Sequence, residues 1–192
     1  MHLPGKICRR IQPMDLEEKT LSSNKIFQGR IVRLRVDQVS LPDGRQSQRE
    51  IVEHPGAVAI LPLDADNRIW MVSQYRKAVE QVLMEIPAGT LEKSEDPLAC
   101  AQRELAEETG LTAGDWQEII QYYCAPGFCD EKTFIYIARN LKQDAQLSPD
   151  HDEFLQVIQL PLAEAYQQIL DGRIVDGKSI IAIQYAVRNY PG

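Results

Sequence analysis

Residues 89–111 read GTLEKSEDPLACAQRELAEETGL and contain the clearest helix signal in the chain. Asp96 is a favourable N-cap, Pro97 suits the first helical position, and Gly110 can end a helix in the left-handed conformation. We therefore expect a helix over residues 97–109. Its core-facing stripe is predicted to contain Leu98, Ala101, Gln102 and Leu105.

Three glutamates crowd negative charge onto this helix. Glu104 and Glu108 are four residues apart and stand above one another, while Glu107 lies one turn from Glu104. Taken alone, such a run is better explained as a solvated acidic face. The alternative is a site for a hard divalent cation, because Mg²⁺ takes oxygen ligands and would relieve the repulsion.

The spacing of the whole segment decides between these alternatives. Gly89, Glu95, the run from Arg103 to Glu108 (RELAEE) and Gly110-Leu111 match the Nudix box at every fixed position. The chain therefore resembles Nudix hydrolases, which cleave a diphosphate linked to another group. This resemblance implies an α+β fold, an α/β/α sandwich on a mixed β-sheet, in which the box forms a loop, a helix and a second loop.

The resemblance also implies roles for residues of the box. The bound metal would be Mg²⁺, with Mn²⁺ as an alternative, and Glu107 and Glu108 would thereby act in catalysis. Its ligands would be the Ala88 carbonyl and the carboxylates of Glu104, Glu107 and Glu108. Glu95 and Arg103 would form a structural ion pair that fixes the loop against the helix.

Features outside the box resemble the branch of the family that hydrolyses ADP-ribose. The sequence QYR at residues 74–76 precedes EIPAG at residues 85–89, and Pro126 lies fifteen residues beyond the box. The implied reaction converts ADP-ribose to AMP and ribose 5-phosphate. Another nucleoside diphosphate sugar, such as GDP-mannose, is one alternative. A non-catalytic module that binds nucleotide sugars is another, but the complete set of box glutamates disfavours it.

Three side chains outside the box are candidates for substrate binding. Arg76 ends an expected strand, and its planar guanidinium suits bidentate phosphate binding, although a surface ion pair is the alternative. Arg49 is a second candidate for the diphosphate or ribose. Glu131 follows a Pro-Gly loop and would contact the ribose or the metal shell, or else be a surface acid.

A general base is expected in the acidic segment at residues 150–153 (DHDE). By resemblance, Glu153 matches the base best because it directly precedes the aromatic Phe154. Asp150 and Asp152 are the alternatives, so the assignment within this segment stays open.

The rest of the chain predicts an N-terminal β-rich arm at residues 1–55 and a Nudix domain at 56–192. Residues 25–40 alternate apolar and polar side chains with a break near Gly29, and a strand returns at 46–53 after a turn at 41–44. By resemblance, this arm would join two subunits of a homodimer. Further strands are expected at 56–63 (buried on both faces), 68–75, 85–89, 116–124, 133–139 and 154–160, and helices at 162–170 and 179–188.

Composition places the chain among ordinary globular proteins, with 44% hydrophobic and 26% charged residues. A net charge of −7 excludes a generic basic nucleic-acid-binding protein. Four cysteines without a CxxC motif predict free thiols, and no apolar stretch has the length of a membrane span. We therefore expect a cytoplasmic protein whose partner is a small nucleoside diphosphate sugar, not nucleic acid or a membrane.

Overall fold

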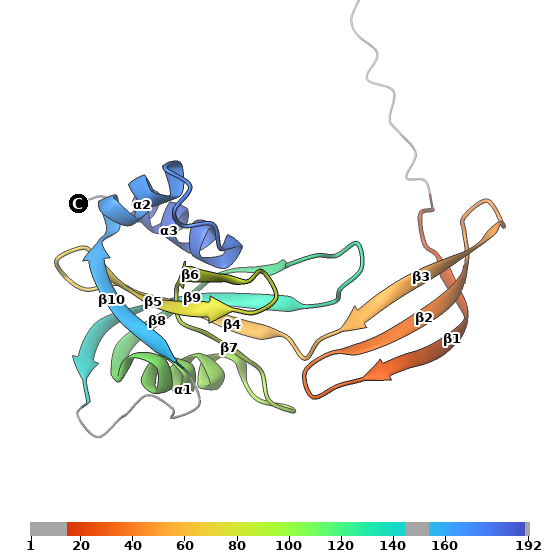
Figure 1. Ribbon diagram of the computed structural model, residues 1–192, viewed down its shortest axis with the longest axis horizontal. Helices are drawn as coiled ribbons and strands as arrows, with labels where there is room; N and C mark the ends of the chain where they lie inside the picture. The colour runs from red at the N-terminus through yellow and green to blue at the C-terminus, as the bar shows by residue number, and fades with distance from the viewer. Residues whose placement is uncertain (1–14, 145–153, 191–192) are drawn as a thin grey trace, which may run out of the picture. The chain divides into compact units, whose positions relative to one another are not determined.

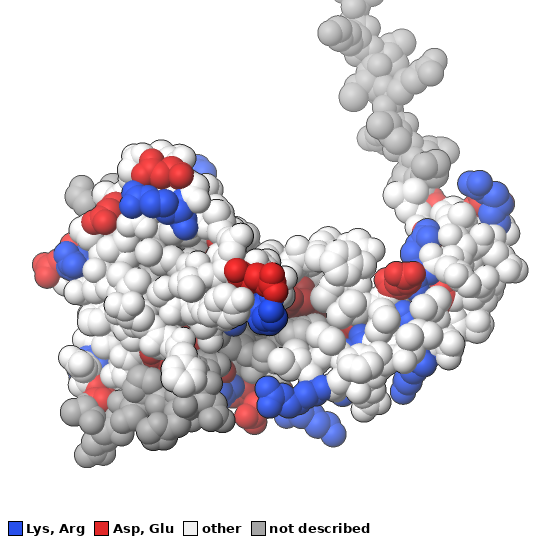
Figure 2. Space-filling model, in the orientation of Figure 1, with Lys and Arg blue, Asp and Glu red and all other residues white. Residues whose placement is uncertain are grey.

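The computed structural model describes residues 15–144 and 154–190. Contacts within the chain divide it after Val52 into two compact units, Met1–Val52 and Glu53–Gly192. On the face shown in Figure 2, much of the surface is uncharged, and acidic and basic side chains are interspersed. In the described ranges, no helix is both long and apolar enough to cross a membrane.

The first unit is a three-stranded sheet in the order β1-β2-β3. Its strands are β1 (Lys19–Gln28), β2 (Arg33–Ser40) and β3 (Gln46–Glu53). The single strand expected over residues 25–40 is instead two antiparallel strands. The chain reverses between them at the expected break, where the Gly29 N–H donates to the Val32 carbonyl at 2.9 Å.

The second unit contains two sheets with helices on either side (Figure 1). The orders are β10-β5-β6 and β7-β4-β9-β8, and the second sheet is mixed because β4 and β9 run parallel. The elements are β4 (Ala57–Pro62), β5 (Arg68–Arg76), β6 (Gln81–Glu85), β7 (Ala88–Thr90), α1 (Pro97–Thr109), β8 (Leu111–Tyr123), β9 (Lys132–Gln143), β10 (Leu155–Pro161), α2 (Leu162–Leu170) and α3 (Gly177–Asn189).

Strand β4 is buried on both faces, as its continuous apolar run predicts. Alternate residues belong to different cores, because side chains alternate between the faces of a strand. Val58 and Ile60 pack with the core on α1. Ala59 and Leu61 pack with the core on α2 and α3. The strand therefore separates the two helical layers.

Helix α1 begins and ends where the sequence predicts. The Asp96 side chain accepts hydrogen bonds from the amides of Leu98 and Ala99, and Gly110 ends the helix with φ of 69°. The predicted core stripe is partly wrong, because Gln102 is exposed and Cys100 is buried. The buried face includes Glu108, so part of the helix side that carries the glutamates is buried.

The strand expected at residues 85–89 is split between two sheets. Glu85 ends β6 and pairs with Val72, whereas Ala88 belongs to β7 and pairs with Ala59. Pro87 lies between them and has no N–H to donate, although its carbonyl accepts from the Ile60 amide at 2.8 Å. One short segment therefore pairs with a strand of each sheet.

Candidate active site

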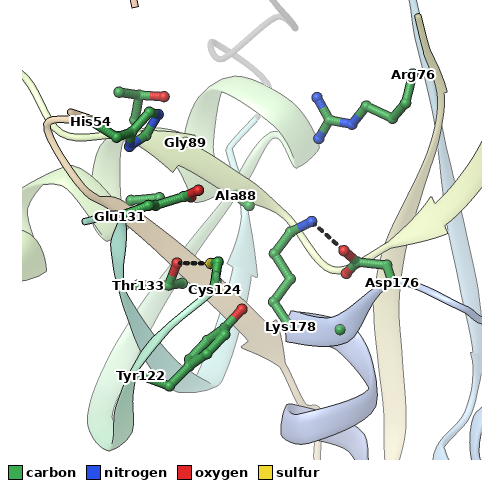
Figure 3. Close-up of a pocket in the computed structure, with 13 residues that line it drawn as sticks. His54, Arg76, Ala88, Gly89, Tyr122, Cys124, Glu131, Thr133, Asp176 and Lys178 are labelled. Atoms are coloured by element: carbon green, nitrogen blue, oxygen red, sulfur yellow. Dashed lines mark hydrogen bonds and ion pairs between the residues drawn. The ribbon is translucent and has the colours of Figure 1, made fainter. Parts of the chain in front are cut away.

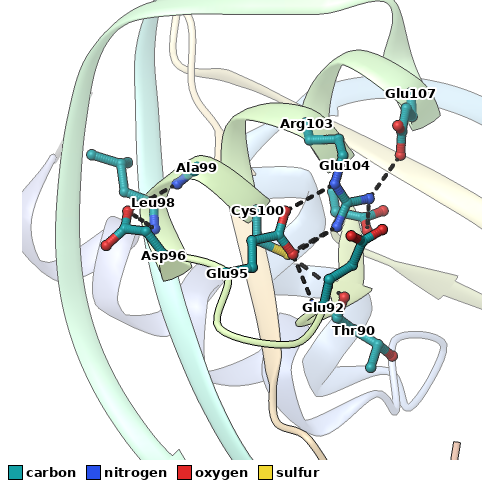
Figure 4. Close-up of polar contacts among 10 residues, drawn as sticks. All are labelled: Thr90, Glu92, Glu95, Asp96, Leu98, Ala99, Cys100, Arg103, Glu104 and Glu107. Atoms are coloured by element: carbon teal, nitrogen blue, oxygen red, sulfur yellow. Dashed lines mark hydrogen bonds and ion pairs between the residues drawn. The ribbon is translucent and has the colours of Figure 1, made fainter.

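Arg103 contacts three glutamates of the segment that contains α1 (Figure 4). Its Nε and Nη2 donate to Glu95 at 3.0 and 3.1 Å. Its Nη1 donates to Glu104 at 2.6 Å and to Glu107 at 3.0 Å. Hydrogen bonds from Arg103 and from the Glu92 amide lower the pKa of Glu95 to about 2. One guanidinium thus ties the loop before the helix to the acidic face of the helix.

The backbone at residues 88 and 89 lies against two other carboxylates of α1. The Ala88 N–H donates to Oε2 of the buried Glu108 at 3.1 Å. A Cβ atom added to Gly89 would lie 1.8 Å from Cδ of Glu104. Glycine is therefore required for this close approach, and the structure brings Ala88, Glu104 and Glu108 together.

A cavity of about 460 Å³ lies beside β7 (Figure 3). Arg76 and Lys178 line one side, and His54 and Glu131 line the opposite side. Sites for small ligands typically measure roughly 300–1,000 Å³, so this cavity suits such a ligand. Ala88 and Gly89 also line it, which places the cavity beside the box carboxylates.

Glu85 holds both cations of the cavity wall. It is 2% exposed, and its two oxygens accept from Nε and Nη2 of Arg76 at 2.8 and 2.9 Å. Lys178 Nζ also donates to Glu85, and to Asp176 at 2.9 Å. Burial opposes ionisation of Glu85, but the bonds from Arg76 and the charge of Lys178 outweigh it and lower the pKa to about 2. The two cations therefore share one buried counter-ion.

The cysteines that the structure describes are free thiols. Cys100 is buried in the core, and burial raises the pKa of its thiol to about 12, so it is not a nucleophile at neutral pH. Cys124 is exposed and lines the cavity, with its sulfur 3.2 Å from the Thr133 hydroxyl. Cys8 lies outside the described residues.

Other predicted site residues are distributed as follows. Arg76 and Glu131 both line the cavity. Arg49 belongs to the first unit, where it donates to Glu18 at 2.8 and 2.5 Å. Glu153, with Asp150 and Asp152, lies outside the described residues.

The family model of the NUDIX domain matches residues 34–182, most of the chain. The chain belongs to the Nudix hydrolase family.

Several proteins resemble this Nudix hydrolase over most of their length. The methanol dehydrogenase activator of Bacillus methanolicus is 49% identical over 88% of this chain and 92% of its own. The ADP-ribose pyrophosphatase of Bacillus subtilis (strain 168) is 44% identical over the same shares. That of Mycobacterium tuberculosis is 41% identical over 86% of this chain and 81% of its own. The predicted family and its ADP-ribose pyrophosphatase branch are thereby confirmed.

A solved structure confirms the predicted fold class. The crystal structure of an ADP compounds hydrolase superimposes with a TM-score of 0.78 and covers 91% of this chain and 94% of that chain. The two sequences are 22% identical, so this likeness concerns the fold alone.

Nudix pyrophosphatases generally need a divalent metal, and the donors at this site fit one. The carboxylates of α1 and the Ala88 carbonyl are hard oxygen ligands, and the bare Cα of Gly89 admits Glu104 to this backbone. Among the described residues, no three acidic, histidine or cysteine side chains already surround a common point. Glu104 and Glu107 each contact Arg103 through one carboxylate oxygen, so this guanidinium already offsets part of their negative charge.

Sequence reasoning did not include Glu85, Asp176 or Lys178 among the site residues. Lys178 stands in the first turn of α3, directly after the N-cap Asp176 and Gly177. A cation there is unfavourable to the helix dipole, and this mismatch is the signal that could have identified it. Glu85 gave a similar signal, because it is an acid inside the apolar segment 82–86.

Proposed function

We propose that this Nudix hydrolase cleaves the diphosphate of ADP-ribose to AMP and ribose 5-phosphate, and that it requires Mg²⁺ or Mn²⁺. One observation carries the proposal. The backbone of Ala88 and Gly89 contacts two box carboxylates and also lines the cavity that Arg76 lines. A cation suited to a phosphate therefore lines the cavity, and the backbone that lines it beside this cation contacts acids suited to a metal. The similarity to ADP-ribose pyrophosphatases supports the choice of substrate.

The acids of α1 hold the metal in this proposal. The ligands are the Ala88 carbonyl and the carboxylates of Glu104, Glu107 and Glu108. When bound, a divalent cation neutralises the diphosphate and makes water a better nucleophile. Arg103 keeps its two bonds to Glu95 in the metal-loaded protein, so the loop remains tied to the helix.

Arg76 and Glu131 orient the substrate from opposite sides of the cavity. Glu85 accepts from Nε and Nη2 of Arg76, and the guanidinium lines the cavity (Figure 3). A planar guanidinium binds phosphate oxygens in a defined orientation. The Glu131 carboxylate accepts hydrogen bonds from ribose hydroxyls. Arg49 is proposed as a further contact to the diphosphate or ribose.

Glu153 accepts the proton of the attacking water as the water oxygen bonds to phosphorus. The bond between that phosphorus and the bridging oxygen breaks, and the bridging oxygen leaves with the other phosphate. Asp150 and Asp152 are the alternatives for this role.

The first unit is proposed to join two chains in a homodimer. All ten residues of β1 are exposed, and Leu21, Ile26 and Phe27 are each more than half exposed. Contiguous exposed apolar side chains typically mark an interaction surface. A second copy of the chain would cover them.

A panel assay tests the reaction. Purified protein is incubated with Mg²⁺ or Mn²⁺ and ADP-ribose, GDP-mannose or other nucleoside diphosphate derivatives, and the products are separated by chromatography. We expect ADP-ribose to be hydrolysed with the highest kcat/KM, and AMP and ribose 5-phosphate to be the products. Preferential hydrolysis of GDP-mannose would replace the substrate but keep the chemistry.

Activation of a dehydrogenase is a second candidate function. It is favoured by the similarity to the methanol dehydrogenase activator of Bacillus methanolicus. Adding the protein to that organism's methanol dehydrogenase and measuring alcohol oxidation tests it. A rate increase that requires the intact box would support this second role, and an unchanged rate would exclude it for this enzyme.

A further inference from the structure

The cavity wall formed by Arg76 and Lys178 has more hydrogen-bond donors than its carboxylates use. An ammonium group has three N–H donors, and in the described chain Lys178 gives one each to Glu85 and Asp176. Arg76 has five, of which Glu85 takes one from Nε and one from Nη2. Donors of both side chains are therefore available to an anion in the cavity that they line.

The two cations are held firmly in place before any ligand binds. Both contact Glu85, whose side chain is 2% exposed, and Lys178 is itself 16% exposed. Because the two bonds converge on one carboxylate, the guanidinium and the ammonium are fixed next to each other. Groups fixed in this way lose little conformational freedom on binding, which favours affinity.

Attachment of α3 to the sheet does not explain Lys178. Ser179, which is fully buried, already links the helix to the end of β6, because its hydroxyl accepts from the Ile86 N–H at 2.8 Å. Asp176 caps the same helix by accepting from the Ser179 N–H at 3.0 Å. The helix start is thus anchored without the ammonium, which is nevertheless placed where the helix dipole disfavours it.

We propose that Lys178 binds the diphosphate of the substrate beside Arg76, and that Glu85 is the positioning residue for both cations. This inference rests on the proposed function and identifies further side chains that would recognise its substrate. On binding, Lys178 gives its third N–H to a phosphate oxygen while it keeps its bonds to Glu85 and Asp176. The guanidinium and the ammonium then contact neighbouring phosphate oxygens from the same wall.

Lys178→Met removes the ammonium and keeps much of the side-chain volume. We expect KM for ADP-ribose to rise roughly 10- to 100-fold, the range for losing a hydrogen bond to a charged group, with a smaller change in kcat. The Kd for ADP-ribose and for pyrophosphate, measured by calorimetry with chelator to prevent turnover, should rise in parallel. Lys178→Arg, which restores the charge, should recover most of the affinity.

Lys77→Met is the matched control. Lys77 is exposed, pairs with Glu80 and adjoins Arg76 in sequence, so the variant makes the same change in net charge near the same strand. KM and Kd should stay within about twofold of the wild type. A purely structural salt bridge would instead lower the melting temperature of Lys178→Met and leave its KM and Kd unchanged, which would overturn the proposal.

A second pair of variants keeps the test decisive if Lys178→Met does not fold. Glu85→Gln removes the buried charge, and Glu85→Gln/Lys178→Met removes the charge and its partner together. The double variant should bind pyrophosphate more weakly than Glu85→Gln does. Equal binding by these two variants would overturn the role of Lys178. Glu85→Gln alone should raise KM, because both cations lose their anchor.

A wrong substrate can be distinguished from a wrong role for Lys178. If the wild type hydrolyses another nucleoside diphosphate sugar and not ADP-ribose, the proposed substrate is wrong. The comparison of Lys178→Met with Lys77→Met is then made with the substrate that is turned over. A raised KM would retain the diphosphate contact, and an unchanged KM would reject it.

Discussion

Gly89 and Glu104 approach each other so closely that a Cβ atom at position 89 would lie 1.8 Å from the Glu104 carboxyl carbon. Gly89→Ala must therefore displace the end of a flexible side chain. We expect the fold to survive and the rate to fall about 10²-fold, the effect of misplacing a catalytic group by about 1 Å. Kinetics and thermal unfolding of the same preparation measure both.

Gly127→Ala is the control for this substitution. Gly127 lies in the loop between β8 and β9, and an added Cβ would have no atom within 4 Å. Its activity should match that of the wild type. If Gly89→Ala is equally active, Glu104 does not need its observed position.

Metal should stabilise the folded protein, because a ligand that binds only the folded state raises the melting temperature with its concentration. Glu108→Gln keeps the shape of the side chain and its bond to the Ala88 N–H but removes a charged ligand. We expect both the metal-dependent shift and the rate to decrease. Chelator should abolish turnover without unfolding the wild type, since Arg103 already offsets the charge of the acids. Undiminished hydrolysis in chelator would contradict the mechanism.

Glu153 is predicted to act on the proton and not on the metal. Glu153→Gln should lower kcat by roughly 10²–10⁴ while the metal-dependent increase in melting temperature persists. Asp150→Asn and Asp152→Asn serve as comparisons. If one of these is inactive and Glu153→Gln is near wild type, the base is the other acid.

The low pKa of Glu85 predicts that the free energy of unfolding decreases in acid. Its pKa of about 2 in the folded protein lies below the ordinary value of 4.5. The ionised group therefore stabilises the fold above pH 4.5, and this contribution is lost as the pH falls from 4.5 toward 2. The full contribution corresponds to about 3 kcal/mol.

Urea unfolding at a series of pH values measures this effect in the wild type and in Glu85→Gln. The difference between their free energies of unfolding should shrink across the same window. The low pKa of Glu95 does not interfere, because Glu95 is present in both proteins. A difference that does not change with pH would contradict the role of Glu85 as a buried counter-ion.

Light scattering at micromolar concentration should give twice 21.8 kDa. Replacing Ile26 or Phe27, both more than half exposed on β1, with serine should shift the mass toward the monomer. The same substitution at Tyr75, which is 52% exposed in the second unit, is the control. A wild-type monomer with full activity would reject the dimer.

Local signals predicted the elements whose boundaries depend on neighbouring residues. Helix α1 has its N-cap and its left-handed glycine within the segment itself, so both ends were predictable. Helix α2 also matches the expected range, 162–170. The continuous apolar run of β4 correctly indicated burial on both faces.

Features that depend on distant parts of the chain were harder to predict. Periodicity placed Gln102 in the core of the protein. In the structure the buried face of α1 instead includes Glu108, which accepts a hydrogen bond from the Ala88 amide. The cavity wall joins Glu85 to Lys178, 93 residues later, and no local pattern reports such a pairing. The box residues could be predicted because their spacing is local. The cavity wall formed by Arg76 and Lys178 could not, because it depends on tertiary packing.

Strand β4 links the two halves of the proposed chemistry. Its side chains face α1 and α3 alternately. Helix α1 carries Glu104, Glu107 and Glu108, and helix α3 carries Lys178. Inserting or deleting one residue within this six-residue strand would move the side chains beyond that point to the opposite core. Both helices would then lose their packing against the strand. The proposed metal ligands and the proposed phosphate-binding cations are therefore under a common constraint during evolution, because both helices pack on one short strand.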